Sequence, residues 1–257
     1  MPLRLAAAEY GAGLPLAIRH GLFGSGRNWA SIAKRLAADR RVVAFDLRNH
    51  GASPWADTMT YGEMAEDVCA SLSAHGHRRS ALLGHSMGGK VAMVAALLHP
   101  DMVERLIVAD IAPVAYRPHH LGLVRAMRGL DLTAVRRRAE ADRRLHSAVP
   151  DPAERAFLLQ NLMFEDGTAR WRINLDAIER AMASLAGFPP MPPGTAYQGP
   201  TLFVGGGRSD YLRAEHGPEI RRLFPKAQIA RIPETGHWLH ADRPDAFVEE
   251  VGRFLTG

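Results

Sequence analysis

The sequence of 257 residues predicts an α/β fold, in which a mostly parallel central sheet is flanked by helices and interrupted by a helical insertion. Short apolar runs alternate along the chain with longer amphipathic stretches, which is the pattern of strands and the helices that cover them. The alternation stops near residue 114 and returns after residue 193. With 47% hydrophobic residues, a chain of this length can build one substantial core.

The chain before residue 114 supplies the first strands and helices. After an N-terminal strand region, apolar runs predict strands at residues 14–18, 41–46, 80–84 and 105–110. Amphipathic spacing predicts helices at residues 29–38, 61–74 and 90–99. Pro100 ends the last of these helices, because proline cannot continue a helix and restricts the residue before it.

Residues 114–193 differ in composition from the rest of the chain. They show no convincing strand pattern, carry helical patterns rich in Arg and Leu, and finish in a proline-rich run at residues 189–193. We expect a helical cap over residues 114–193, inserted into a core domain made of residues 1–113 and 194–257. The core pattern then returns, with strands at 201–204 and 228–232 and a helix at 245–255.

The net charge of +5 comes almost entirely from arginine, because the chain has only three lysines. Acidic residues are interspersed among the arginines, which favours a solvated basic surface, so we expect no nucleic-acid partner. Residues 117–172 hold eleven arginines against seven acidic residues. Steering of an anionic thioester by these arginines is a second hypothesis, less favoured than the solvated surface.

The sequence also bears on compartment and cofactors. With Cys69 as the single cysteine, an intramolecular disulfide is impossible. No apolar run approaches 18 residues and the N-terminus lacks a leader pattern, so we expect a cytoplasmic protein without a membrane span. The histidines lack the H-E-x-x-H spacing of zinc ligands, and no glycine-rich nucleotide fingerprint occurs, so we expect no metal and no other cofactor.

The segment Gly84-His85-Ser86-Met87-Gly88 lies between a predicted strand and a predicted helix. In this context G-x-S-x-G is the nucleophile elbow of the α/β-hydrolase fold, a sharp turn that lifts the serine hydroxyl above the sheet. Small residues flank the serine because the strand and helix backbones approach closely there. The sequence therefore predicts Ser86 as the nucleophile, in preference to a serine that only caps the helix.

A serine nucleophile needs a general base, and chain position selects that base among 12 histidines. In this fold the order along the chain is nucleophile, acid, histidine. His237 follows the last predicted strand and precedes the final helix, so we predict it as the base. His240 is its nearest rival, whereas His20, His50 and His85 are expected to be structural.

Two backbone N–H groups should bind the oxyanion of the tetrahedral intermediate. Met87, the residue after the nucleophile, is expected to supply one of them. The second should come from the loop after the early strand, where His20-Gly21-Leu22-Phe23-Gly24 occurs. We predict Leu22 as this donor, with Phe23 as the alternative.

Two aspartates compete as the acid that orients His237. Asp110 ends the strand predicted at 105–110, and Asp210 follows the strand predicted at 201–204, which is the commoner position in this fold. Both strand ends open onto the same face of the sheet. Spacing alone leaves the choice open.

Four segments together resemble the YbfF-type esterases, a subgroup of the α/β-hydrolase superfamily that also includes a mitochondrial abhydrolase-domain protein. The four segments are His20-Gly21-Leu22-Phe23-Gly24-Ser25, Asp46-Leu47-Arg48-Asn49-His50-Gly51, Gly84-His85-Ser86-Met87-Gly88-Gly89-Lys90 and Gly236-His237-Trp238. The resemblance implies Asp110 as the acid, and Ser209 as an extra hydrogen-bonding partner of His237. Asp210, directly after that serine, does not belong to the pattern of the subgroup and remains the competing acid.

The sequence thus predicts a serine hydrolase that cleaves a carboxylic ester or thioester, acyl-CoA among them, through an acyl-enzyme intermediate. Its partner would be a small-molecule substrate, and the oligomeric state is left open. Carbon–carbon hydrolases, lyases and cofactor-free peroxidases share this elbow and triad and remain alternatives, as does a non-enzymatic small-molecule receptor. A dehalogenase or epoxide hydrolase is disfavoured, because Ser86 stands where those enzymes carry an aspartate. Seven apolar residues of the cap are candidates for the wall of the acyl pocket, although their helical spacing indicates that most of them pack in the core of the cap. These candidates are Leu121, Met127, Phe157, Leu158, Leu162, Phe164 and Trp171.

Overall fold

The computed structural model describes residues 1–118 and 120–257. Seven strands form one sheet in the order β1-β3-β2-β4-β5-β8-β9. Only β1 runs antiparallel to its neighbour, so the prediction of a mostly parallel sheet is confirmed. The strands are β1 (Ala7–Tyr10), β2 (Leu14–Arg19), β3 (Arg40–Phe45), β4 (Ser80–His85), β5 (Val103–Ala109), β8 (Thr201–Gly206) and β9 (Ala227–Ile232).

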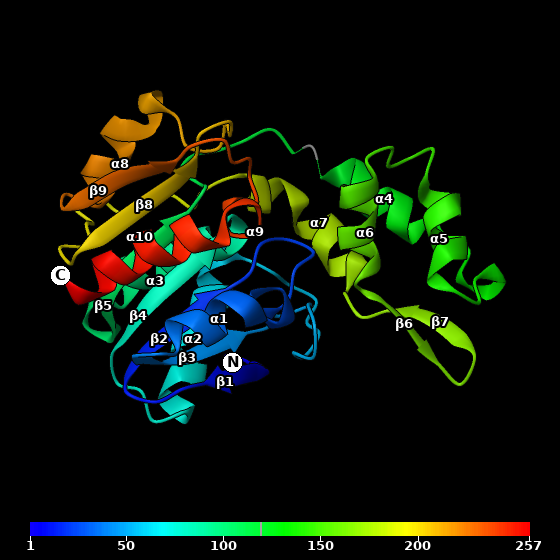
Figure 1. The fold of residues 1–257 in the computed structure, drawn as a ribbon, viewed down its shortest axis with the longest axis horizontal. Coiled ribbons are helices and arrows are strands. Elements are labelled where there is room, and N and C mark those ends of the chain that lie inside the picture. The colour runs from blue at the N-terminus through cyan, green and yellow to red at the C-terminus, as the bar shows by residue number, and fades with distance from the viewer. Residues whose placement is uncertain (119) are drawn as a thin grey trace.

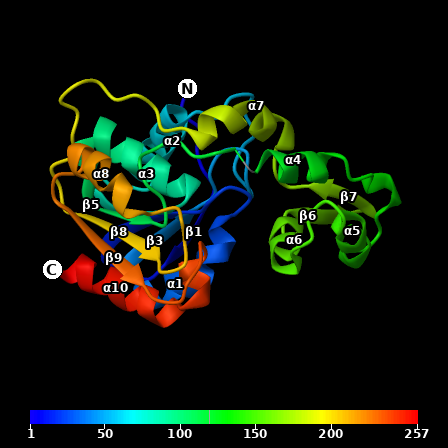
Figure 2. The same ribbon diagram turned by 90° about the horizontal axis from the view of Figure 1, so that it is seen from above.

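Helices cover both faces of this sheet (Figure 2). One face carries α2 (Tyr61–Ala74), α3 (Met87–Leu98) and α8 (Gly217–Leu223), and the other carries α1 (Ala30–Leu36) and α10 (Pro244–Thr256). Two separate hydrophobic clusters fill the layers between sheet and helices. A short helix, α9 (Leu239–Asp242), precedes α10, and 3₁₀ turns occur at Gly26–Trp29, Pro100–Met102, Leu132–Ala134 and Ala214–His216. Within the described ranges, no helix combines the length and the apolar character needed to cross a membrane.

The position of each strand in the sheet explains its sequence. Every residue of the central strand β4 is buried, since helices cover both of its faces, and residues 80–84 are accordingly small or apolar. The edge strand β9 is mostly exposed: Gln228, Ile229 and Arg231 are exposed, and only Ile232 is buried. The predicted strands and helices of the core therefore occur at their expected places, with shifts of a few residues at their ends.

The insert, by which we mean residues 114–193, lies beside the sheet and its helices (Figure 1). It contains α4 (Leu121–Arg128), α5 (Arg138–Leu145), α6 (Pro152–Leu159) and α7 (Leu175–Ala186). A hydrophobic cluster of its own joins α4, α5 and α6, with Leu130 and Leu145 among its members. The long helix α7 runs from this part of the insert back to the core domain (Figure 1).

The expectation that the insert contains no strand is wrong. β6 (Leu162–Glu165) and β7 (Thr168–Trp171) form an antiparallel hairpin. Asp166 and Gly167 connect them and have positive φ angles of 49° and 74°. An Asp-Gly pair favours this conformation and is a strong signal for a two-residue hairpin turn. Strands of four residues each are too short to show a period among the surrounding helical patterns.

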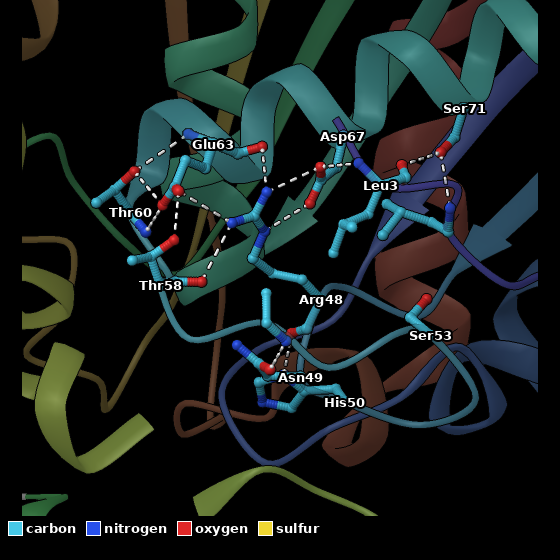
Figure 3. A network of polar contacts seen from close by, with 12 residues as sticks. Leu3, Arg48, Asn49, His50, Ser53, Thr58, Thr60, Glu63, Asp67 and Ser71 are labelled. Carbon is cyan, nitrogen blue, oxygen red and sulfur yellow. Dashed lines mark hydrogen bonds and ion pairs between the residues drawn. The ribbon is translucent and has the colours of Figure 1, made fainter. Parts of the chain in front are cut away.

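A buried ion pair holds the loop after β3 against α2 (Figure 3). The Arg48 guanidinium donates from Nε to Asp67 Oδ2 at 2.6 Å and from Nη2 to Asp67 Oδ1 at 2.9 Å. The side chain of Arg48 is 4% exposed, and that of Asp67 is fully buried. Asp67 also accepts the backbone N–H of Leu3, so the N-terminal segment, the loop and α2 share one carboxylate. This bidentate pair fixes the loop that carries His50.

Candidate active site

The predicted site residues lie at the carboxyl ends of neighbouring strands. Ser86 follows β4, Asp110 follows β5, Ser209 follows β8 and His237 follows β9, while Leu22 follows β2. These five strands are consecutive in the sheet, in the order β2-β4-β5-β8-β9. Because the carboxyl ends of parallel strands meet at one edge, residues up to 215 positions apart come together there.

Ser86 occupies a strained turn between β4 and α3. Its φ and ψ are 51° and −121°, a backbone conformation that residues other than glycine rarely adopt. A Cβ on Gly84 would lie 2.1 Å from the carbonyl oxygen of Gly88, and one on Gly88 would lie 2.5 Å from the carbonyl oxygen of His20. Both glycines of the G-x-S-x-G pattern are therefore required by the close approach of three backbone segments.

His237 is hydrogen-bonded to Asp110. Its Nδ1–H donates to Asp110 Oδ2 at 2.7 Å, and the carboxylate is fully buried. Asp110 also accepts the backbone N–H of Gly206 at 2.9 Å, and its own φ of 50° turns the side chain toward these partners. Since Nδ1 carries the proton, Nε2 of His237 is free to act as a base.

Ser209 contacts the acid and not the histidine. The resemblance to the YbfF-type esterases implied a bond from Ser209 to His237, but the Ser209 hydroxyl donates to Asp110 Oδ2, the oxygen that also accepts from His237. Asp210 is exposed, and no hydrogen bond or ion pair in the described part of the chain joins it to His237. The structure thus brings Asp110 to the histidine and leaves Asp210 at the surface.

Tyr211 and His85 contact His237 at its ring and at its backbone. The ring of Tyr211 stacks on the imidazole with 4.1 Å between centroids, at an interplanar angle of 28°. His85 Nε2 donates to the backbone carbonyl oxygen of His237 at 2.8 Å. Burial holds the pKa of His85 well below its ordinary value, so this ring is a neutral donor. The sequence indicated no role for Tyr211, because nothing in its neighbourhood shows that it faces His237.

Ser86 and His237 line one pocket without a hydrogen bond between their side chains in the described residues. Contacts between a nucleophile and its base are often long in enzymes without substrate and tighten when the substrate binds. Because Ser86 and His237 line the same pocket, a substrate bound there would have both residues beside it.

The loop after β2 distinguishes between the two candidate oxyanion donors. The Phe23 N–H donates to Nε2 of His50 at 3.3 Å and is therefore occupied. The Leu22 N–H makes no hydrogen bond to another described residue. Met87 is the first residue of α3, so its N–H has no acceptor within the helix. The geometry favours Leu22 and Met87 as the pair of donors over Phe23.

Two buried histidines brace this loop. His20 Nδ1 donates to the Gly21 carbonyl at 2.8 Å, and Nε2 accepts the Leu47 N–H at 2.9 Å. His50 Nδ1 donates to the Arg48 carbonyl at 3.0 Å. Burial lowers the pKa of His20 to about 4 and that of His50 to about 3, so both stay neutral. They act as fixed donor–acceptor pairs that connect the loops after β2 and β3.

Ser86 lines two pockets. The histidine pocket has His237, Trp29 and Phe157 among its lining residues. The lysine pocket is lined by residues that include Tyr61, Lys90 and Tyr116. Leu22, Ser86 and His120 line both pockets.

The insert contributes to the walls of both pockets. Phe157 and Leu158 of α6 line the histidine pocket, and Met182 and Leu185 of α7 line the lysine pocket. Of the other apolar residues considered for the acyl pocket, Met127 and Leu162 are buried in hydrophobic clusters, whereas Phe164 is exposed. Leu121 and Trp171 are partly buried against hydrophobic clusters and line neither pocket among the described residues.

Within residues 1–118 and 120–257, no group of three or more His, Cys, Asp or Glu side chains is arranged to hold a metal ion.

The insert is also attached next to the candidate oxyanion loop, because the Asn161 side chain donates to the Phe23 carbonyl at 2.8 Å. The position of α6 and the conformation of that loop are therefore linked directly.

Comparisons with known proteins show the family to which the chain belongs. Residues 15–244 match the family described as the alpha/beta hydrolase fold. The sn-1-specific diacylglycerol lipase ABHD11 of Mus musculus is 42% identical over 265 residues, which cover 100% of this chain and 86% of that protein. Esterase YbfF of Escherichia coli (strain K12) is 33% identical over 243 residues, which cover 94% of this chain and 93% of the esterase. Among solved structures, a marine microorganism esterase superposes with a TM-score of 0.95 at 38% identity, over 98% of this chain and 99% of the other.

Proposed function

Because the chain belongs to the α/β-hydrolase family and is a hydrolase of the esterase and lipase type, we propose that it cleaves carboxylic esters through an acyl-enzyme intermediate on Ser86. The observation that carries the proposal is the bond from His237 to the buried Asp110, beside a serine held in a strained turn. That arrangement leaves one unprotonated imidazole nitrogen and one hydroxyl facing a shared pocket.

In the acylation step, Ser86 Oγ attacks the ester carbonyl while His237 Nε2 accepts its proton. The developing oxyanion is bound by the N–H groups of Leu22 and Met87. Collapse of the tetrahedral intermediate breaks the ester C–O bond, and the imidazolium gives its proton to the departing alcohol. Asp110 keeps the imidazole in the tautomer that this transfer needs.

Deacylation repeats the sequence with water. His237 removes a proton from a water molecule that attacks the acyl-enzyme, and the free carboxylic acid leaves as Ser86 regains its proton.

The same steps cleave a thioester, with a thiol in place of the alcohol, and we include thioesters such as acyl-CoA in the proposal. Esters of acylglycerols are one class to test, since a relative is named as a diacylglycerol lipase.

We further propose that the insert acts as a cap on the substrate pockets. The support comes from α6 and α7, which contribute Phe157, Leu158, Met182 and Leu185 to the pocket walls. An ester bound at Ser86 would then lie between the sheet edge and the insert, away from bulk water.

The test uses a fluorophosphonate and a short acyl ester such as 4-nitrophenyl butyrate. We expect stoichiometric labelling of Ser86 and many turnovers of the ester, with Ser86→Ala lowering kcat by about 10⁴-fold or more. The control is Ser184→Ala, which removes an exposed serine of α7 and should leave kcat unchanged. Labelling without turnover would support a receptor instead of an enzyme. Parallel assays with butyryl-CoA separate thioester from ester preference.

A further inference from the structure

The lysine pocket contains a buried cation next to the nucleophile. Lys90 lies on α3, four residues after Ser86 and so one helical turn away, and it is 2% exposed. The other two lysines of the chain, Lys34 and Lys226, are exposed. The mechanism described above gives Lys90 no part in the reaction.

The Lys90 ammonium has polar and aromatic partners but no anionic one. Its Nζ donates to the carbonyl oxygens of Ala186 at 3.0 Å and of Gly187 at 2.5 Å, at the end of α7. The ring centroids of Tyr116 and Tyr61 lie 4.9 and 5.7 Å from Nζ. An ammonium has three N–H donors, so two carbonyls leave one donor over. No carboxylate in the described part of the chain pairs with it, and a buried charge without a counter-charge is unfavourable.

The two pockets beside Ser86 differ in charge. Lys90 and Arg117 are the only charged residues among the described lining residues of the lysine pocket, and Arg117 is exposed. In the histidine pocket, the only described lining residue with a formal charge is Glu154. An anionic group would therefore be attracted to the lysine pocket and repelled from the other one.

The chemistry of the reaction assigns one part of the ester to each pocket. His237 must protonate the leaving alcohol, and it lines the histidine pocket, so the alcohol belongs there. Met87 lines the lysine pocket, as do Leu22 and Ser86, whereas His237 does not line it in the described structure. The acyl chain, which stays on Ser86 after the alcohol leaves, therefore extends into the lysine pocket.

We infer that the lysine pocket binds an acyl group that carries a carboxylate, so that the substrate is a monoester of a dicarboxylic acid. The inference rests on the proposed ester hydrolysis at Ser86. The carboxylate would accept the remaining N–H of Lys90, with Arg117 attracting it at the surface and apolar Met182 and Leu185 packing on the chain between.

A matched pair of substrates tests this assignment. Monobenzyl adipate and benzyl hexanoate have the same alcohol and nearly the same acyl length, but only the first carries a terminal carboxylate. We expect the wild-type protein to prefer monobenzyl adipate, with a kcat/KM about tenfold to hundredfold higher, most of it through a lower KM. Release of benzyl alcohol, measured by chromatography, gives both values.

Substitution of the lysine should remove the preference. Lys90→Met is expected to lower kcat/KM for monobenzyl adipate about tenfold more than for benzyl hexanoate. Lys34→Met removes the same charge from an exposed site of α1 and should leave the ratio of the two kcat/KM values unchanged. Should Lys90→Met fold poorly, Arg117→Gln at the pocket surface supplies a second variant, for which the ratio should fall by a smaller factor.

The pH dependence of the same ratio is a further readout. Burial lowers the pKa of Lys90 to about 7, so the ammonium loses its proton near neutrality unless an anion is bound. The other titratable or charged side chains lining this pocket are Tyr61, Tyr116, Arg117, His120 and Tyr211. Burial raises the pKa of each of these three tyrosines, so they stay neutral. The preference for monobenzyl adipate should decline as the pH rises from 6 to 8.5.

The outcomes separate this inference from the proposed function. Turnover of benzyl hexanoate with no preference for monobenzyl adipate, or a preference that survives in Lys90→Met, overturns the carboxylate site while ester hydrolysis stands. Turnover of neither ester contradicts ester hydrolysis itself.

Discussion

Asp110 connects more of the candidate site than any other side chain described above. Its buried carboxylate accepts from the His237 imidazole, the Gly206 amide and the Ser209 hydroxyl. The Gly206 amide and the Ser209 hydroxyl restrain the rotation of this carboxylate, which in turn holds the imidazole in one orientation. Ser209 acts through Asp110 and is in this sense a positioning residue.

Substitution of each aspartate by asparagine tests which of them is the acid. Asp110→Asn should lower kcat for ester hydrolysis by about 10³- to 10⁴-fold, because an amide at this position can stabilise the wrong imidazole tautomer. Asp210→Asn, at an exposed site one residue from Ser209, should stay within about threefold of the wild type. Steady-state kinetics of both variants measure this, with circular dichroism to verify folding. A larger loss in Asp210→Asn would reverse the assignment of the acid.

The backbone of the turn between β4 and α3 packs closely against the end of β2 and the loop that follows it. Gly88 lies where a Cβ would come within 2.6 Å of the carbonyl oxygens of both Arg19 and His20. The carbonyls belong to β2 and the loop that follows, so the nucleophile turn and the candidate oxyanion loop are packed directly on each other. Any residue larger than glycine must push these two parts of the site apart.

A pair of glycine substitutions tests this packing. Gly88→Ala should lower the free energy of unfolding by about 1–3 kcal/mol and reduce kcat, because the methyl group displaces the backbone that carries Leu22. Gly252→Ala is the control: it lies inside α10, and a Cβ there meets nothing within 4 Å. That variant should raise the free energy of unfolding by about 0.5–1 kcal/mol and leave kcat unchanged. Urea titration and ester kinetics would decide, and equal effects of the two substitutions would count against the packing argument.

Across the whole molecule, four buried histidines link the site to the stability of the fold. Burial lowers the pKa of His20 to about 4 and that of His50 and His240 to about 3, and it holds the pKa of His85 far below its ordinary value. They come from the loops after β2 and β3, from β4 and from α9, and three of them, His20, His85 and His240, line the same pocket as Ser86 and His237. All four are neutral in the folded protein near neutral pH.

These histidines predict a loss of stability in mild acid. Below their unfolded pKa of about 6.5, the unfolded chain binds protons that the folded chain does not, so the free energy of unfolding falls with pH. Between about pH 6 and its folded pKa, each buried histidine lowers the free energy of unfolding by up to about 1.4 kcal/mol for every unit by which the pH falls. Above pH 7 this loss is absent, so the stabilisation is fully present there. Urea unfolding at several pH values between 4.5 and 7.5 would reveal the slope.

The contribution of His240 to this pH dependence of stability can be tested separately. The ring of His240 stacks on Trp29 with 4.2 Å between centroids, and its Nδ1 has no hydrogen-bond partner among the described residues. His240→Phe keeps the stack and should reduce the acid slope by about 1 kcal/mol per pH unit. His146→Phe replaces an exposed histidine of the insert and should leave the slope unchanged. An identical slope in all three proteins would refute the role of buried histidine.

Local patterns in the sequence determined most of the core. The helix predicted at 61–74 has the same bounds in the structure, and the strands near residues 80 and 228 lie within two residues of their expected ends. These elements were predictable because hydrophobic period and turn chemistry depend on neighbours along the chain. The hairpin at β6 and β7 and the seven-residue helix α8 were missed, since neither is long enough to show a period.

The sequence by itself predicted that Ser86 lies in a sharp turn between a strand and a helix, because the G-x-S-x-G motif is contiguous and its glycines answer a local backbone requirement. Only the tertiary structure decided which aspartate meets His237, that Ser209 contacts this aspartate and not the histidine, and that His50 occupies the Phe23 amide. It also revealed Lys90 beside the pocket at Ser86. The physical reason is that these contacts join residues that lie far apart along the chain, on different strands and loops. Whether such residues form a hydrogen bond depends on distances and angles that the spacing of residues in the sequence does not encode.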